Sequence, residues 1–402
     1  DLPDEPLLII LSFAVLASIL YQPTSYRFIF DSPIFRWIIA YLIWMFISLC
    51  YAPNQWLAIK FLLAKTWYML PLVLLTALIH HRSGNFKKTA LYLCIPMLLV
   101  VIQTLTRHAF DGFDFVAIKK TMGPFFRNHV NYSAMLVCLI PVGFLIHHFT
   151  QDPQKKKFIK AGIAIAFIGL FFAYSRGAWL ALIVGVAGYW LIKKNMLGKA
   201  ILVGLITTII ALVALINNNR FMQFAPEHDQ TIFHENFSEH LNATIGLKDI
   251  SNAERIHRWV AGVRMVAEKP WTGFGANSFY NNYQPYTAAP FKTWVSNNPE
   301  HSTVHNYFLL IALEQGIPAL LLFAGLLIYL LLQAQQLYHQ FQNNYYRAIA
   351  LVLGIILLMI TSLNFTSDLI ETDKIGGLFW LTAGLLIGLK YHLKIEKETT
   401  AV

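Results

Sequence analysis

The sequence predicts an all-α integral membrane protein with about eleven transmembrane helices and one large loop that contains short helices. Of its 402 residues, 56% are hydrophobic and only 13% are charged, which is more apolar surface than a fold in water could cover. The hydrophobic residues also form long runs with few charges inside them. One long stretch, 217–304, has the composition of a soluble protein and is the expected loop.

The apolar runs have about the length of a membrane span, because a helix of roughly 20 residues crosses about 30 Å of hydrocarbon. The run 158–192 has 35 residues and would extend about 50 Å as one helix. We therefore expect it to fold back at Ser175-Arg176-Gly177, which places Arg176 at the tip of a helical hairpin. The expected spans are 6–21, 33–51, 61–80, 89–106, 130–149, 158–174, 178–192, 199–216, 307–337, 348–363 and 376–393.

Loops rich in lysine and arginine stay in the cytoplasm, so their positions predict the orientation of the chain. Three such loops are 82–88, 155–160 and 193–199. Alternation then places 107–129, Arg176, 217–304 and the short loop around Asp368 on the opposite side. Because the first run then starts on that opposite side, we expect one further N-terminal helix and about twelve spans in the full protein.

This topology divides the chain into four parts. Transmembrane helices occupy 1–216 and 305–393, the large loop occupies 217–304, and a cytoplasmic tail occupies 394–402. The loop 107–129 departs from the charge rule because it contains Lys119, Lys120, Arg127 and His129. We expect this basic patch to be functional and to attract a polyanionic substrate, or else to lie at the membrane interface.

The large loop contains one predicted amphipathic helix. Ser251-Asn252-Ala253-Glu254 has the spacing of a capping box, apolar residues follow at helical period, and Pro270 ends the pattern. Arg255 and Arg258 are three residues apart, so they are neighbours on one face of this helix.

Several function classes lack their sequence signatures. The chain has no Walker A sequence, no glycine-rich dinucleotide motif after a strand, no His-Glu-x-x-His and no cysteine pair at metal spacing. Cys50, Cys94 and Cys138 lie in or beside apolar runs, where a thiol behaves as a small hydrophobic group. The net charge of +10 is spread between the apolar runs rather than gathered on one domain. We therefore expect no cofactor, no metal and no nucleic-acid partner.

Arginine and histidine are the residues on the expected outer side that could carry chemistry. A guanidinium group is a planar, permanently charged fork that can hold phosphate or pyrophosphate oxygens through paired hydrogen bonds. The competing interpretation is that these arginines bind lipid head groups or acidic neighbours and fix the topology. Arg176 lies between two apolar helices, where removing its charge from water is costly. The competing interpretation is therefore weaker for Arg176. The set is Arg176, Arg255, Arg258, Arg264, His301 and His305.

The two histidines are four residues apart just before an apolar run, so we expect both to face one side of the first turn of a helix. A zinc pair would need a third ligand, and no spaced acidic or histidine partner stands out. A lone general base is more economical, because a neutral imidazole can take a proton from an attacking hydroxyl. A structural role at the helix start remains the alternative for either histidine.

Three pieces of the sequence resemble the O-antigen ligase and polymerase superfamily of bacterial envelope glycan enzymes. The first is Tyr174-Ser175-Arg176-Gly177-Ala178 at the hairpin tip. The second is the segment 254–259, Glu-Arg-Ile-His-Arg-Trp, followed by 268–275, Glu-Lys-Pro-Trp-Thr-Gly-Phe-Gly. The third is His-Asn-Tyr-Phe-Leu at 305–309 with Ala-Leu-Glu-Gln-Gly-Ile at 312–317. With the hydropathy pattern, the resemblance covers roughly 130–387.

The resemblance implies a metal-independent glycosyltransferase in the bacterial inner membrane, with its active site facing the periplasm. Such an enzyme takes a glycan from undecaprenyl pyrophosphate and needs no cofactor. By matching motif, Arg176 and Arg255 would hold the pyrophosphate, and His305 would orient or deprotonate the acceptor hydroxyl. A single displacement would invert the anomeric configuration. Further substrate contacts are expected from Arg258, Arg264, His301, Asn306 and Arg127.

The first hypothesis for the acceptor is the lipid A core, which makes the protein an O-antigen ligase. A polymerase with a second carrier-linked glycan as acceptor shares the same motifs and remains the nearest alternative. Protein O-oligosaccharyltransferase is a further alternative. Many such enzymes of this superfamily have a large extra C-terminal region, and its absence from this sequence favours a lipid or glycan acceptor over a protein one. A transporter or flippase is the alternative from another class, although no internal repeat is evident.

Overall fold

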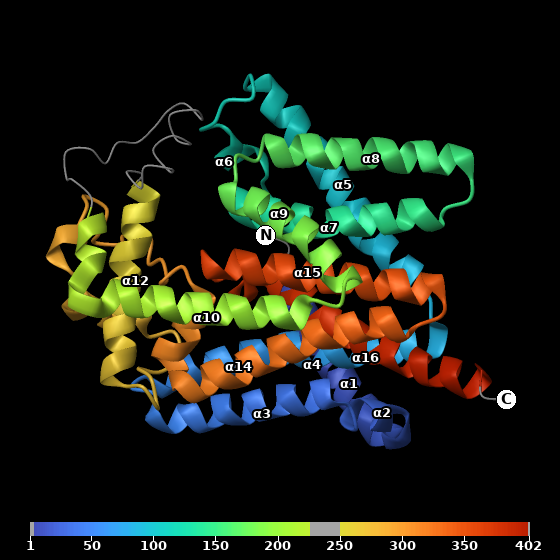
Figure 1. Cartoon of the computed structure of the whole chain (residues 1–402), viewed down its shortest axis with the longest axis horizontal. Helices are drawn as coiled ribbons and strands as arrows, with labels where there is room; N and C mark the ends of the chain where they lie inside the picture. The colour runs from blue at the N-terminus through green and yellow to red at the C-terminus, as the bar shows by residue number, and fades with distance from the viewer. Residues whose placement is uncertain (1–3, 226–249, 401–402) are drawn as a thin grey trace.

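The computed structural model describes residues 4–225 and 250–400, and every regular element within those two ranges is a helix. The long helices run side by side, and α12 (Ile250–Glu268) lies across one end of the bundle, in yellow in Figure 1. These observations confirm the predicted all-α fold class. Residues 226–249 of the predicted large loop, together with 1–3 and 401–402, lie outside the described ranges.

Each of the eleven predicted apolar runs is a helix in the structure. These helices are α1 (Asp4–Tyr21), α3 (Pro33–Ser48), α4 (Gln55–Ser83), α5 (Phe86–Phe110), α7 (His129–Phe149), α8 (Pro153–Phe171), α9 (Arg176–Lys193), α10 (Leu197–Ile216), α14 (Tyr307–Gln340), α15 (Asn344–Phe365) and α16 (Asp373–Thr400). The short α-helices are α2 (Arg27–Phe30), α6 (Ile118–Thr121) and α13 (Phe279–Asn282). The 3-10 helices are η1 (Pro23–Tyr26), η2 (Leu49–Tyr51), η3 (Asn217–Phe224), η5 (Gln284–Tyr286), η6 (Ala289–Phe291) and η7 (Leu369–Glu371).

The count of eleven spans is not confirmed. Among the described residues, eight helices are long and apolar enough to cross a membrane, and a ninth is possible if α1 and the following segment Pro23–Phe30, bent by 114°, form one span. The predicted runs in α8 and α9 are outside this set. Three consecutive lysines lie near the start of α8, and α9 has Arg176 and Lys193 at its ends. These charges shorten the uninterrupted apolar stretch that each helix offers to lipid.

The predicted hairpin is confirmed. Helix α8 ends at Phe171 and α9 begins at Arg176, so the apolar run does fold back at the expected place. Tyr174 has a φ of 52°, in the left-handed region that turns the chain sharply. Its hydroxyl donates a hydrogen bond of 2.8 Å to the carbonyl oxygen of Phe113, which ties the hairpin tip to the loop after α5.

Helix α14 is broken at Gly316, where φ is 81° and ψ is 169°. Glycine is required there because an added Cβ would lie 2.2 Å from the carbonyl oxygen of Trp271. The backbone N–H of Ile317 donates instead to the carbonyl oxygen of Pro270 at 2.7 Å. The break therefore lets the loop after α12 come close enough to α14 for hydrogen bonds between the two backbones.

The same loop makes two further backbone hydrogen bonds to α14. Phe274 N donates to Leu313 O, and Gly275 N donates to Glu314 O, each at 2.9 Å. The buried carboxylate of Glu314 in turn accepts from the backbone N–H groups of Asn277 and Ser278 at 2.8 and 3.0 Å. Two of the three sequence pieces thus dock on one another and fix α12 against the start of α14.

Candidate active site

The predicted loop helix is α12, but its start differs from the expectation. Its described part begins at Ile250, so Ser251 lies inside the helix rather than at the N-cap of a capping box. Ile250 is itself buried. The helix ends at Glu268, just before Pro270, as predicted.

Arg258 of α12 is fixed inside the protein. Its Nη2 atom lies 3.3 Å from Glu254 Oε2 and 3.4 Å from Asn298 Oδ1, and both members of the ion pair are 8% exposed. Arg258 and Glu254 are one helical turn apart, which is the spacing that brings opposite charges together. Because both charges are buried, loss of either partner would leave the other uncompensated.

Glu254 is held by two hydroxyl groups as well as by Arg258. Thr293 Oγ1 and Ser296 Oγ both donate to Glu254 Oε1, the latter at 3.1 Å. Asn298 extends the network, because Ser302 N donates to its Oδ1 at 2.8 Å and its Nδ2 donates to Ser302 O at 2.7 Å. This network connects α12 to the chain segment that leads into α14.

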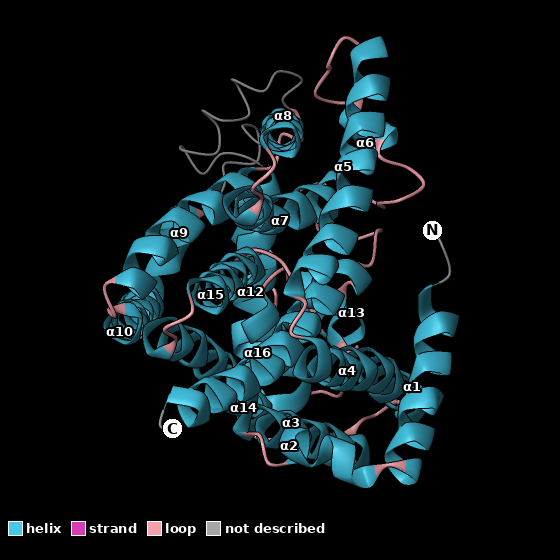
Figure 2. Cartoon of the chain, turned by 90° about the vertical axis from the view of Figure 1, so that its right-hand side faces the viewer, coloured by secondary structure: helices cyan, strands magenta, loops and turns pink. Residues whose placement is uncertain are grey.

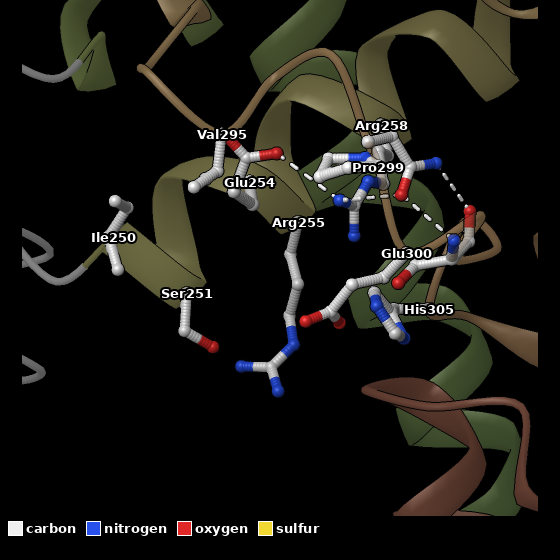
Figure 3. Close-up of a pocket in the computed structure, with 11 residues that line it drawn as sticks. Ile250, Ser251, Glu254, Arg255, Arg258, Val295, Pro299, Glu300 and His305 are labelled. Carbon is white, nitrogen blue, oxygen red and sulfur yellow. Dashed lines mark hydrogen bonds and ion pairs between the residues drawn. The ribbon is translucent and has the colours of Figure 1, made fainter.

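A cavity of about 240 Å³ opens between α12 and this segment. Figure 3 shows the side chains of Arg255, Glu300 and His305 reaching into the same opening, with Arg258 behind them. The cavity therefore carries guanidinium, carboxylate and imidazole groups side by side. Its lining residues are Ile250, Ser251, Glu254, Arg255, Arg258, Val295, Asn298, Pro299, Glu300, Ser302 and His305.

His305 lies in the loop before α14, with a φ of 53°. Asn306 caps α14 by accepting from Leu309 N at 3.0 Å, so the helix begins at Tyr307 and both histidines precede it. The expectation that His301 and His305 share the first helical turn is therefore wrong. A non-glycine residue in the left-handed region is uncommon, and such strain often accompanies functional sites.

The imidazole of His305 has an acidic neighbour and two cationic ones. Its Nδ1 lies 3.8 Å from Asp368 Oδ1, and Asp368 Oδ2 accepts a 2.7 Å hydrogen bond from Thr303 Oγ1. Burial, followed by the positive charges of Arg258 and Arg255, lowers the pKa of His305 to about 3. Burial also raises the pKa of Asp368. His305 is thus neutral near pH 7 and able to accept a proton.

Arg176 lies at the same end of the bundle as His305. A Cβ added to the next residue, Gly177, would lie 3.9 Å from Thr366 Oγ1, which places the hairpin tip against the end of α15. The residues that follow His305 contact that same end: Asn306 Nδ2 donates to Phe365 O, and Tyr307 N donates to Ser367 O, each at 3.0 Å. The end of α15 therefore lies between the hairpin tip that carries Arg176 and the chain segment that contains His305.

The other predicted contact residues are more dispersed. The exposed Arg264 donates from Nη1 to the carbonyl oxygens of Tyr286 and Thr287 at 3.0 and 3.1 Å. The exposed His301 stacks on Tyr280 with ring centroids 3.9 Å apart. Arg127 is exposed in the loop before α7, as are Lys119 and Lys120 in α6. In the part of the chain that the structure describes, none of these side chains lines the cavity. They could contact only those parts of a substrate that extend beyond the cavity.

Sequence reasoning did not assign chemistry to several acidic and amide residues of the site. Glu254 could have been found, because it stands four residues before Arg258 on a predicted helix. Asn298, Glu300 and Asp368 have no periodic relation to the arginines and are brought there by the fold. Among the described residues, no three His, Cys, Asp or Glu side chains form a group that could hold a metal ion.

The fold and this cavity define a multi-pass helical membrane protein with a site lined by charged and polar residues at one end of its bundle. A comparison with protein families then narrows the class. The family model described as O-antigen ligase matches residues 161–324, from α8 through the break in α14, which include Arg176, Arg255 and His305. This match confirms the relation to the O-antigen ligase superfamily that the three sequence pieces indicated. No curated protein matches the sequence significantly.

Proposed function

We propose that this chain transfers a glycan from undecaprenyl pyrophosphate to an acceptor hydroxyl at the periplasmic face of the inner membrane, and that the acceptor is the lipid A core. The observation that carries the proposal is that Arg255, Arg258 and His305 line one cavity, at the bundle end that also holds Arg176. A pyrophosphate ligand and a proton acceptor are both needed for this reaction, and the cavity offers groups suited to each.

The donor pyrophosphate would be bound by Arg255 and Arg176. In Figure 3, the guanidinium of Arg255 extends into the opening, and the guanidinium of Arg258 contacts Glu254 and Asn298. Arg258 therefore sets the position of the helix, while the direction of the Arg255 side chain suits a ligand for the leaving group. Two guanidinium groups can stabilise the charge that grows on a departing pyrophosphate.

The acceptor would be activated by His305. The acceptor oxygen attacks the anomeric carbon, the bond from that carbon to the pyrophosphate oxygen breaks, and the hydroxyl proton moves to the imidazole. The neighbouring Asp368 would then stabilise the imidazolium, because its carboxylate lies 3.8 Å from Nδ1. One displacement of this kind inverts the configuration at the anomeric carbon. The carrier linkage supplies the driving force, so no nucleotide is consumed.

The proposal is tested with the purified full chain, a carrier-linked glycan and lipid A core, in EDTA and without nucleotide. Product should form, and a strict requirement for added metal would refute the mechanism. Arg255→Lys keeps the charge and removes the fork, so we expect transfer to fall by about 100-fold or more. His305→Ala should lose transfer as well. Matched controls at the opposite end of the bundle are Arg82→Lys and His148→Ala, which should transfer at the wild-type rate.

The acceptor class is tested separately in a deletion strain. Polymerised glycan that accumulates on the carrier would indicate loss of a ligase. A core capped with a single repeat unit would indicate loss of a polymerase, and it would refute the ligase assignment while leaving the donor site intact.

A further inference from the structure

A second and larger cavity, of about 550 Å³, lies among α5, α7 and α8. In the perpendicular view of Figure 2, these three helices lie together at one side of the bundle. Most of the lining is apolar and includes Leu91, Cys94, Leu98, Leu139, Ile159 and Ile163. An aqueous substrate has little to bind in such a cavity, whereas a hydrocarbon chain fits its chemistry.

One end of this cavity is polar. Lys87 is in the first turn of α5, Thr150 caps the end of α7, and Lys155 is in the first turn of α8, and all three line the cavity. The Nζ atom of Lys155 lies 3.7 Å from Asp152 Oδ2, but both side chains are well exposed, so this pair is weak and exchangeable. The result is an apolar cavity with a cationic mouth.

The mouth is at the opposite end of the bundle from the candidate active site. The far ends of α5 and α8 lead to Phe113 and Tyr174, which are hydrogen-bonded beside the hairpin tip that carries Arg176. A phosphate at the lysine mouth therefore cannot be the one that Arg176 and Arg255 would bind. The two sites therefore lie at opposite ends of the bundle.

The cavity is long enough to cross the hydrocarbon of one leaflet. The lining residues of α5 extend from Lys87 to Val101, which is about 21 Å along a helix. Half of a typical hydrocarbon core is about 15 Å. A single acyl chain that begins at the lysine mouth can therefore run through the cavity to the middle of the membrane.

We propose that this cavity binds one acyl chain of an anionic phospholipid, with the lipid phosphate held by Lys87 and Lys155. The apolar lining selects a hydrocarbon chain, and the two lysines select negative charge at its head. The other lysines of the first turns of α8, Lys156 and Lys157, increase the positive potential around the mouth. The positive-inside rule assigns this mouth to the cytoplasmic leaflet.

The test measures lipid binding to the full purified chain by native mass spectrometry, with phosphatidylglycerol and phosphatidylcholine of identical acyl chains. We expect phosphatidylglycerol to bind preferentially. Each lysine near a lipid surface contributes about fivefold in affinity, so Lys87→Gln with Lys155→Gln should weaken phosphatidylglycerol about 25-fold. The matched control, Lys194→Gln with Lys199→Gln, makes the same charge change at the same end of the bundle and should change binding less than about twofold.

A second pair of variants tests the chain cavity. Ala166 lines the cavity, so Ala166→Phe should weaken both lipids, whereas Ala164→Phe on the exposed face of the same helix should weaken neither. The proposal is overturned if the two lipids bind equally, or if the control lysine pair matters as much as the mouth pair. Displacement of phosphatidylglycerol by undecaprenyl phosphate would also overturn it, because the cavity would then hold the carrier tail. None of these outcomes depends on transferase activity.

Discussion

Substitution of Gly316 tests whether the break in α14 positions the candidate active site. With φ 81° and ψ 169°, this residue occupies a region of backbone space that is essentially restricted to glycine. Alanine there costs about 1–3 kcal/mol in backbone strain alone. Its Cβ would also lie 2.2 Å from the carbonyl oxygen of Trp271, a separation that real Cβ atoms essentially never show, so the loop must move.

The movement has a second energetic consequence. The hydrogen bond from Ile317 N to Pro270 O joins this loop to α14, and a buried N–H left without its partner costs about 1–3 kcal/mol. The total expected destabilisation for Gly316→Ala is therefore about 2–6 kcal/mol. Because the loop connects α12 to α14, the distance from Arg255 to His305 should change as well, and transfer should fall more than the folded fraction does.

The assay is thermal unfolding of the purified chain in detergent, followed by transfer rates normalised to folded protein. Gly204→Ala is the matched control, because Gly204 lies in α10 and an added Cβ there meets nothing within 4 Å. Alanine should stabilise that helix by about 0.5–1 kcal/mol. A Gly316→Ala protein that melts and transfers like wild type would refute the reasoning.

Three further predictions concern buried and titratable groups. Burial and the two arginines of α12 lower the pKa of His305 to about 3 in the free enzyme, and a bound pyrophosphate would offset the charges of those arginines. The acid limb of the pH profile of kcat should therefore lie at higher pH than the acid limb of kcat/KM. Acid limbs at the same pH would contradict this prediction. Glu254→Gln leaves Arg258 buried without its counter-charge and should lower stability by about 3–5 kcal/mol, read as a lower Tm. Lys65 and Glu371 form a 2.7 Å ion pair, so Lys65→Met should strongly destabilise the folded protein. The added Glu371→Met change should restore much of the lost stability in a double-mutant cycle. Additive losses of stability would contradict the pairing.

Hydropathy predicted where the helices are, because a membrane imposes one length scale on every apolar run. It did not settle which helices span the membrane, since α8 and α9 combine apolar cores with charged ends. The fold-back at Ser175 was predictable for the same physical reason, because a continuous helix of that length would overshoot the bilayer.

The basic residues of the candidate site were predictable from the sequence, and its acidic residues were not. Arg255, Arg258 and His305 were recognised from motif and residue type, and the fold brings all three to one cavity. Asp368 lies in the loop between α15 and α16 and contacts His305. No local sequence pattern encodes this contact. Arg264 was assigned to substrate because arginines of one helix look alike in sequence, whereas the structure gives it carbonyl partners outside the cavity.

The two arginines of α12 illustrate how the fold divides one residue type between two roles. Arg258 is buried against Glu254, and the cost of removing both charges from water is offset only while the pair and its hydroxyl partners stay together. This arrangement makes the helix rigid where it faces the chain segment before α14. Arg255, one residue after Glu254, projects from that rigid helix into the opening beside His305. A guanidinium held on an immobile element needs little reorganisation when negative charge develops on a ligand, which is the condition under which electrostatic stabilisation of a transition state is most effective.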